Sequence, residues 1–385
     1  MNPSRSGWIT KLLKLLNVNS QREFETLEQL YPKLRSVGFI YGSNMATLDH
    51  VNDNSDYTNE ERCKINLLIA LYAVHTQTKS TKPFEKNLLN FYKEITGYKS
   101  TFISTILGTN LETILHKRIH IDNNILTKNF SFFVTNALLF MDVMAYKEYL
   151  KGEKNTIRYL KQFENFIRAL VLSALNSKSL KTSYDNSLIN LLESSFRFTD
   201  DTTQNYKAFT NAAPSKLESF YYLDLACMST WSDLRLEGTE QEFLNKLGSD
   251  LKISKTTILE SITSVQTFYT THKSKMALLN SKNSVQNFYD NTSLMVRKLI
   301  SRNSKRLFKE LKESKELVKL LSQSTHRELN NIEQKQMQEQ LLDVLKSIPS
   351  LAIFLLPGGA ILLPLFVKFI PKLLPSAFDD NRIKD

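Results

Sequence analysis

The chain has 385 residues, of which 42% are hydrophobic and 23% charged, and this globular composition excludes a mainly disordered protein. Its 10 glycines and 9 prolines are fewer than a fold rich in sheets and turns requires, and no glycine-rich phosphate-binding motif occurs. The two cysteines, Cys63 and Cys227, exclude a disulfide framework and a cysteine zinc site. A net charge of +11 favours an anionic partner, either nucleic acid or an acidic membrane face.

Apolar residues recur at spacings of three and four along most of the chain, and strict alternation is rare, so the sequence predicts an all-α protein. Pro32 is expected to kink or break the second helix. Thr58 and Glu61 form a capping box that starts the third. The expected helices lie near 8–16, 21–37, 60–76, 83–95, 110–120, 127–150, 155–176, 187–196, 216–229, 239–251, 255–273 and 284–321, followed by a last amphipathic helix that ends at 347.

A polar segment, Asp200–Pro214, is the best internal boundary, because it has little periodicity and ends at a proline. We therefore expect an N-terminal helical region over 1–199, a second helical region over 214–328 that contains a basic helix, and a membrane motif with its tail over 329–385. The N-terminal residues have no apolar core of the kind that a secretory signal requires.

The C-terminal segment is different in composition. Ile348–Val367 is a run of twenty residues without a charge, long enough to cross a hydrocarbon core of about 30 Å. The segment also holds five of the nine prolines. The alternative interpretation is a buried hairpin in a soluble core, broken at Pro357-Gly358-Gly359. The residues that define this motif are Pro349, Pro357, Gly358, Gly359, Pro364, Lys368, Pro371 and Pro375.

Three of these prolines, Pro357, Pro364 and Pro371, are seven residues apart and would share one face of a helix, which Lys368 joins. Such a face is poorly suited to lipid. The pair Gly358-Gly359 allows close approach of another backbone, so this face is predicted to contact protein, either a second copy or the preceding helix.

Several blocks of this segment, 342–349, Pro357, 363–364, 369–371 and 373–378, resemble the membrane motif of the LETM family. These are the leucine-zipper and EF-hand-containing transmembrane proteins of mitochondrial inner membranes and their bacterial relatives. The opening residues, 1–9, and the overall layout are similar to bacterial LETM-related proteins named as biofilm-associated. The resemblance implies an inner-membrane protein associated with cation/proton exchange and volume control, and in some members with ribosomes.

Two departures from the family pattern limit what the resemblance implies. The family carries an acidic residue inside the span, just before the second proline block, and this chain has Ala360 there. An intramembrane carboxylate is the natural cation ligand, so we expect no robust cation/proton exchange by this chain alone. The family's ribosome-facing domain follows the span, whereas this sequence has seven residues after Phe378.

A basic segment precedes the apolar one. Between Arg297 and Lys319 there are nine basic and three acidic residues. This pattern suits the anionic cytoplasmic leaflet, and the positive-inside rule then places the body in the cytoplasm. The resemblance implies that the membrane is a bacterial inner membrane. A solvated helix face and contact with nucleic acid or ribosomal RNA are the alternatives. The residues expected to contact the anionic surface are Arg297, Lys298, Arg302, Lys305, Arg306 and Lys309.

Signals for chemistry are weak. Glu112, His116 and His120 are four residues apart and share a helix face, which makes them a weak metal candidate against a solvated face. The loop Asp49–Glu60 has the length of a calcium loop but lacks the turn glycine, and helix capping is the simpler interpretation. Asp142 interrupts an apolar run that is too short to span a membrane, so a buried core helix is expected there. We therefore expect no cofactor, no resident metal and no enzymatic activity.

Two functions from different classes remain. The first is a non-enzymatic inner-membrane protein of LETM type that contacts membrane lipid and acts in ion homeostasis or in an envelope or biofilm process. The second is a soluble basic adaptor that binds RNA or ribosomes and folds its apolar tail inside.

Overall fold

A computed structural model divides the chain into two units, a helical body and a C-terminal unit. The helical body comprises residues 9–121 and 130–279, and the C-terminal unit comprises residues 1–8, 122–129 and 280–385. The part of these units that the structure describes is helical and contains no strand, which confirms the all-α prediction there. The described residues are 1–4, 6–18, 24–52, 57–78, 80, 82–96, 110–119, 136–152, 156–177, 206–209, 214–230, 238–272, 296–324, 327–348, 351 and 363–373.

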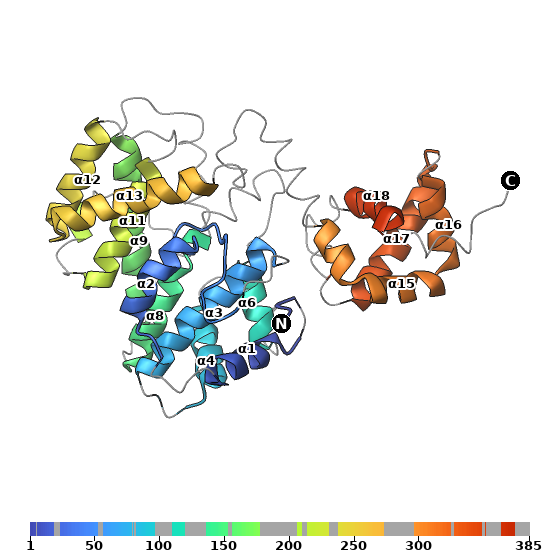
Figure 1. The fold of residues 1–385 in the computed structure, drawn as a ribbon, viewed down its shortest axis with the longest axis horizontal. Helices are drawn as coiled ribbons and strands as arrows, with labels where there is room; N and C mark the ends of the chain where they lie inside the picture. The colour runs from blue at the N-terminus through green and yellow to red at the C-terminus, as the bar shows by residue number, and fades with distance from the viewer. Residues whose placement is uncertain are drawn as a thin grey trace. The chain divides into compact units, whose positions relative to one another are not determined.

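The helical body is a bundle in which α3 is covered on several sides (Figure 1). Leu67, Leu68 and Leu71 of α3 are fully buried, and this helix packs on α2, α6 and α8. The described elements of the body are α1 (Trp8–Val18), α2 (Leu27–Ser36), α3 (Asn59–Gln77), α4 (Phe84–Thr96), α6 (Leu111–Ile119), α8 (Phe140–Leu150), α9 (Thr156–Asn176), the short 3-10 helix η1 (Tyr206–Phe209), α11 (Lys216–Thr230), α12 (Gly238–Asp250) and α13 (Lys255–His272).

Local sequence explains where the helices begin. Thr58 and Glu61 form the predicted capping box, in which the Glu61 amide donates to the Thr58 hydroxyl and the Thr58 amide donates to the Glu61 carboxylate. Thr26 and Gln29 cap α2 in the same way. Pro32 does not break the helix, because α2 continues through it. Its neighbours Tyr31 and Leu34 are buried, so tertiary packing compensates for the missing backbone hydrogen bond.

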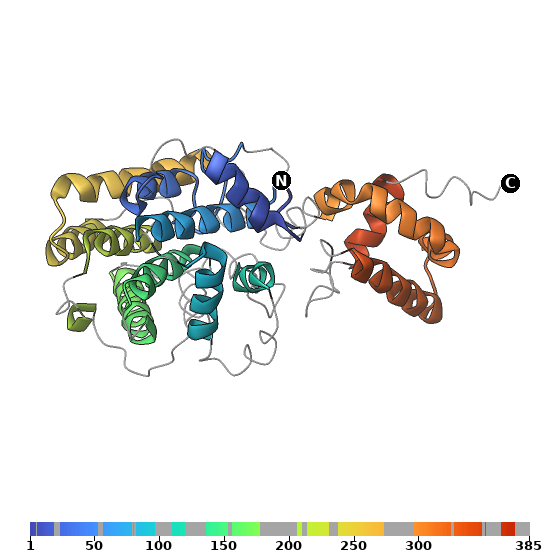
Figure 2. The same cartoon turned by 90° about the horizontal axis from the view of Figure 1, so that it is seen from below.

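Aromatic side chains fill the space between α9 and α11. The rings of Phe166 and Tyr222 lie 4.1 Å apart, and Phe163 stacks beside Tyr221. Tyr221 and Tyr222 are buried, so they belong to the core and do not form an open surface for stacking on bases. The helix α13 in turn packs along α11 and α12, and both views show this arrangement (Figure 2).

Helices from both sides of the predicted boundary at 200–214 thus pack together in one unit. The division into 1–199, 214–328 and 329–385 stays a prediction. Both cysteines lie inside this body, Cys63 in α3 and Cys227 in α11, and burial raises the pKa of each thiol.

The C-terminal unit consists of a helical segment at 296–302 and the helices α15 (Ser304–Glu313), α16 (Lys315–Ser324), α17 (Asn331–Ser347) and α18 (Leu363–Leu373). The sequence predicts one continuous helix up to residue 321, but the structure interrupts it twice. Asn303 is buried and its side-chain amide donates to the Leu299 carbonyl at 2.8 Å, and Ser314 leaves helical geometry with a ψ of 71°. Small polar side chains that bond to nearby backbone favour such breaks.

The helix α18 packs on α16, and Phe366, Phe369 and Ile370 are buried among the leucines of α15–α17. It has 11 residues, about 16 Å of helix against a hydrocarbon core of about 30 Å. In the described part of the chain, no helix has both the length and the apolar character that a membrane crossing requires. Of the predicted span Ile348–Val367, residues 349–350 and 352–362 lie outside the described residues.

Candidate anionic-surface site in the C-terminal unit

The helix α15 is amphipathic. Leu307 and Leu311, four residues apart, are fully buried in the apolar cluster of the C-terminal unit. Lys305, Lys309 and Lys312 follow one another at spacings of four and three on the exposed side. The buried leucines therefore fix the direction of three lysines, which we call the lysine stripe.

An aromatic ring lies beside the lysine stripe. Phe308 is three residues after Lys305 and four before Lys312, and it is half-buried against the apolar cluster. The Lys312 ammonium lies 4.9 Å from the centre of its ring. A second such contact joins the segment 296–302 to α18, where the Arg297 guanidinium lies 4.4 Å from the centre of the Phe369 ring.

The six residues predicted to contact an anionic surface lie in the segment 296–302 and in α15, and they differ in exposure. Arg297, Lys305, Arg306 and Lys309 are exposed, whereas Lys298 and Arg302 are half-buried. Within the described residues, no carboxylate lies at ion-pair distance from Lys305, Arg306 or Lys309. Their positive charge is therefore directed at solvent.

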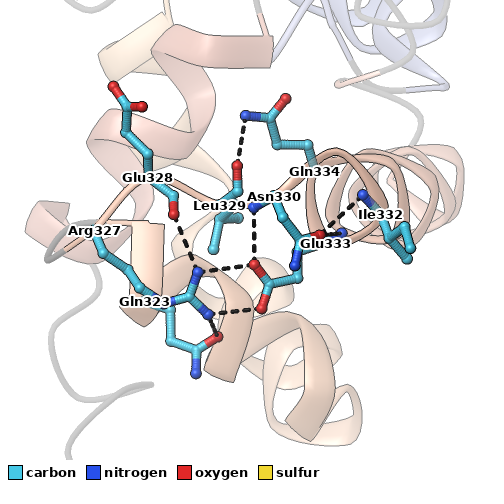
Figure 3. A network of polar contacts seen from close by, with 8 residues as sticks. All are labelled: Gln323, Arg327, Glu328, Leu329, Asn330, Ile332, Glu333 and Gln334. Carbon is cyan, nitrogen blue, oxygen red and sulfur yellow. Dashed lines mark hydrogen bonds and ion pairs between the residues drawn. The ribbon is translucent and has the colours of Figure 1, made fainter.

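The start of α17 is fixed by a polar network (Figure 3). The Asn330 side-chain oxygen accepts from the amides of Ile332 at 3.0 Å and Glu333 at 2.9 Å. Arg327 donates to both carboxylate oxygens of Glu333, at 2.6 and 2.8 Å. These hydrogen bonds lower the pKa of Glu333 to about 2. Ile332 itself is 73% exposed beside this network.

Fold and site together describe an all-α protein with a basic, helical C-terminal unit. Residues 329–385 match the family model described as LETM1-like, RBD, so the resemblance is confirmed for this segment, which is LETM1-like. The match covers 57 of the 385 residues. No curated protein and no solved structure matches the chain.

The proline motif is only partly within the described residues. Pro349, Pro357, Gly358, Gly359 and Pro375 lie outside them. Pro364 is the second residue of α18, where a missing amide costs little, and Pro371 lies inside the same helix. Lys368 is exposed on α18. Self-association through a proline face stays a prediction.

The metal candidate is not assembled among the described residues. The Glu112 carboxylate accepts from the backbone amide of Ile9 at 3.3 Å. His116 instead meets Glu60 and Lys64 of α3, each 3.0 Å from its Nδ1 atom. His120 lies outside the described residues. Glu112 and His116 thus each contact a group outside the predicted trio.

The loop at Asp49 is tied to α2. Lys33 donates to Asp49 and Glu25, each at 2.8 Å, and His50 lies between the same two carboxylates. Glu25, Asp49 and His50 have the spacing of a metal site, but the Lys33 ammonium already supplies their cation. Of the other ligand positions considered for a calcium loop, Asp53 and Ser55 lie outside the described residues, and Glu60 lies in α3, where it pairs with Lys64.

Two buried ion pairs in the body were not anticipated. Asp142, correctly expected in a core helix, accepts from Arg118 through both carboxylate oxygens, at 2.7 and 3.1 Å. Asp224 pairs with Arg35. The sequence signal was a single acid within an apolar helix, which identifies the carboxylate but not its distant arginine.

Proposed function

We propose that this protein is a non-enzymatic, membrane-associated protein of LETM1-like type, whose C-terminal unit contacts an anionic membrane surface through its basic helices. The observation that carries the proposal is the exposed lysine stripe of α15, held in one direction by Leu307 and Leu311. It lies in the same unit as the LETM1-like segment 329–385. Each lysine or arginine near an anionic leaflet contributes about 1 kcal/mol of binding free energy.

In this proposal the protein lies at the bacterial inner membrane with its body in the cytoplasm, and it acts in ion homeostasis or an envelope process. The resemblance to the LETM family supports the location at a membrane, and the basic segment supports the cytoplasmic side for the body. Ion exchange by the chain alone is not part of the proposal, because Ala360 stands where relatives carry a carboxylate.

The second candidate is an adaptor for RNA or ribosomes. The packing of α18 supports it, because Phe366 and Ile370 are fully buried by protein in the C-terminal unit. The same basic helices would then face phosphates of an RNA backbone, which bind exposed lysines without sequence selectivity.

Vesicle sedimentation distinguishes the two. The full chain is mixed with neutral vesicles, with vesicles containing phosphatidylserine, and with phosphatidylserine vesicles plus excess unstructured RNA. Pelleting that requires phosphatidylserine and survives RNA supports the membrane function. Binding to RNA without binding to any vesicle supports the adaptor and contradicts the membrane function.

A further inference from the structure

We infer that α15 contacts an anionic lipid surface along one defined edge, with the Phe308 ring entering the interface and the lysine stripe on the phosphates. This inference rests on the proposed function and deepens it, because it names the inserting residue and the orientation of the helix. Positive charge alone would allow α15 to lie on the membrane in many orientations, whereas an aromatic ring between lysines favours one orientation of the helix.

The positions around α15 are unequal. Phe308 lies next to Lys305 and Lys312 on the helix surface, since residues three and four apart are neighbours. The acidic residues Glu310 and Glu313 follow Lys309 on the opposite flank of the lysine stripe, away from Phe308. The exposed Arg306 lies on that same flank, four residues before Glu310, so the flank has one cation and two acids. An anionic surface is therefore attracted more strongly to the Phe308 flank than to the other.

In water, the Lys312 ammonium lies over the face of the Phe308 ring. The ammonium lies 4.9 Å from the ring centre, a weak interaction at an exposed site. Lipid phosphates attract the same ammonium, and long lysine side chains move readily between such positions. When Lys312 turns to a phosphate, the half-buried ring is left facing the acyl boundary, where aromatic rings are stable.

The geometry favours lipid over RNA at this edge. Stacking on a base requires an open aromatic face, but Phe308 is half-buried against the apolar cluster of the unit. The exposed cations of α15 are three lysines and Arg306, and lysine acts as a point charge rather than a bidentate clamp on phosphate. A shallow, partly covered ring with point charges around it suits the headgroup region.

The test uses the full chain with Phe308→Trp, compared with the unmodified chain to subtract the signals of Trp8 and Trp231. On phosphatidylserine vesicles the added fluorescence should shift to the blue, and lipids brominated near the glycerol should quench it. The control Ile332→Trp introduces a tryptophan at a 73% exposed position of α17, and its fluorescence should stay unshifted.

A charge variant provides the second readout. Lys305, Lys309 and Lys312 changed together to Gln should weaken binding to phosphatidylserine vesicles on the order of 100-fold, from about fivefold per lysine. The matched control changes three exposed lysines elsewhere, Lys246, Lys255 and Lys335, to Gln. It removes the same charge and should weaken binding far less.

The outcomes separate the two proposals. If the chain binds the vesicles but tryptophan at 308 is neither shifted nor quenched, or if both lysine triples weaken binding equally, the edge contact is refuted and the membrane function stands. If the chain binds no vesicle, the membrane function falls as well. A tryptophan at 308 that responds to RNA and not to vesicles would identify RNA as the occupant and overturn the inference.

Discussion

The Arg35 guanidinium of α2 lies 3.0 Å from the Asp224 carboxylate of α11, across 189 residues of sequence. Asp224 is 1% exposed and also accepts hydrogen bonds from the hydroxyls of Tyr31, at 2.6 Å, and Ser261 of α13. Burial raises the pKa of Asp224, while Arg35 and the two hydroxyls oppose that rise. One carboxylate therefore joins three helices of the body.

Asp224→Ala should destabilise the body by about 3–5 kcal/mol, because it leaves the half-buried Arg35 charge and two buried hydroxyls without their acceptor. Urea unfolding followed by circular dichroism measures the change. The control is Asp343→Ala, since the pair of Asp343 with Lys346 is exposed and such pairs contribute about 0–1 kcal/mol. Equal effects of the two variants would contradict a structural role of the buried pair.

The pair of Arg118 and Asp142 allows a sharper test. Arg118→Met alone should lower the free energy of unfolding by about 3–5 kcal/mol, because the fully buried Asp142 loses its bidentate partner. Adding Asp142→Leu should recover most of the loss, since apolar replacement of a whole buried pair is often neutral. A double variant as unstable as the single one would show that Asp142 has a further essential role.

Two histidines should make the body sensitive to mild acid. Burial lowers the pKa of His50, against the effect of Asp49 and Glu25, and burial lowers the pKa of His75. The unfolded chain then binds more protons than the folded one below about pH 6.5, so the free energy of unfolding should fall as the pH drops through that range. Urea midpoints at about pH 7.5 and 5.5 measure the slope, which His50→Gln with His75→Gln should flatten. A rise in the free energy of unfolding on acidification would refute this prediction.

The packing of α18 predicts that Phe366→Ala destabilises the C-terminal unit by about 3–5 kcal/mol, because a fully buried ring is lost from its core. Hydrogen exchange of the α16 and α17 amides reports on that unit without interference from the body. Ile332→Ala, at an exposed position, serves as the control. Unchanged protection in the Phe366 variant would indicate that α18 is not part of this core.

Asn330→Ala should destabilise the same unit by about 1 kcal/mol, because the first turn of α17 loses the acceptor of two backbone amides. Hydrogen exchange at Ile332 and Glu333 should accelerate most. Asn330→Ser keeps a capping oxygen and should behave like the original chain. Faster exchange confined to other helices would contradict the capping role.

Helix positions were largely predictable from the sequence, because local signals determine them. The spacing of leucines and the capping box at Thr58 and Glu61 locate α3 to within one residue at its start. The breaks at Asn303 and Ser314 were missed, since the charge pattern around them continues at helical spacing and only tertiary packing shows that each residue leaves the helix.

The candidate site was predictable in composition but not in geometry. The basic residues of 297–319 stand out in the sequence, yet their direction depends on which leucines are buried. The contact of Arg297 with Phe369 joins residues far apart, and a single sequence contains no signal for it. The same limit applies to Asp142 and Asp224, whose arginines lie on other helices.

The burial of Cys63 and Cys227 has a practical consequence for all of these experiments. Protonated thiols that water does not reach react slowly with maleimides and oxidants, because the thiolate is the reactive species. A single cysteine introduced at an exposed position of α15 or α17 should therefore be labelled selectively in the folded protein, with both native cysteines retained. The native thiols then serve as an internal control, because labelling of Cys63 or Cys227 reports that the body has unfolded at least locally.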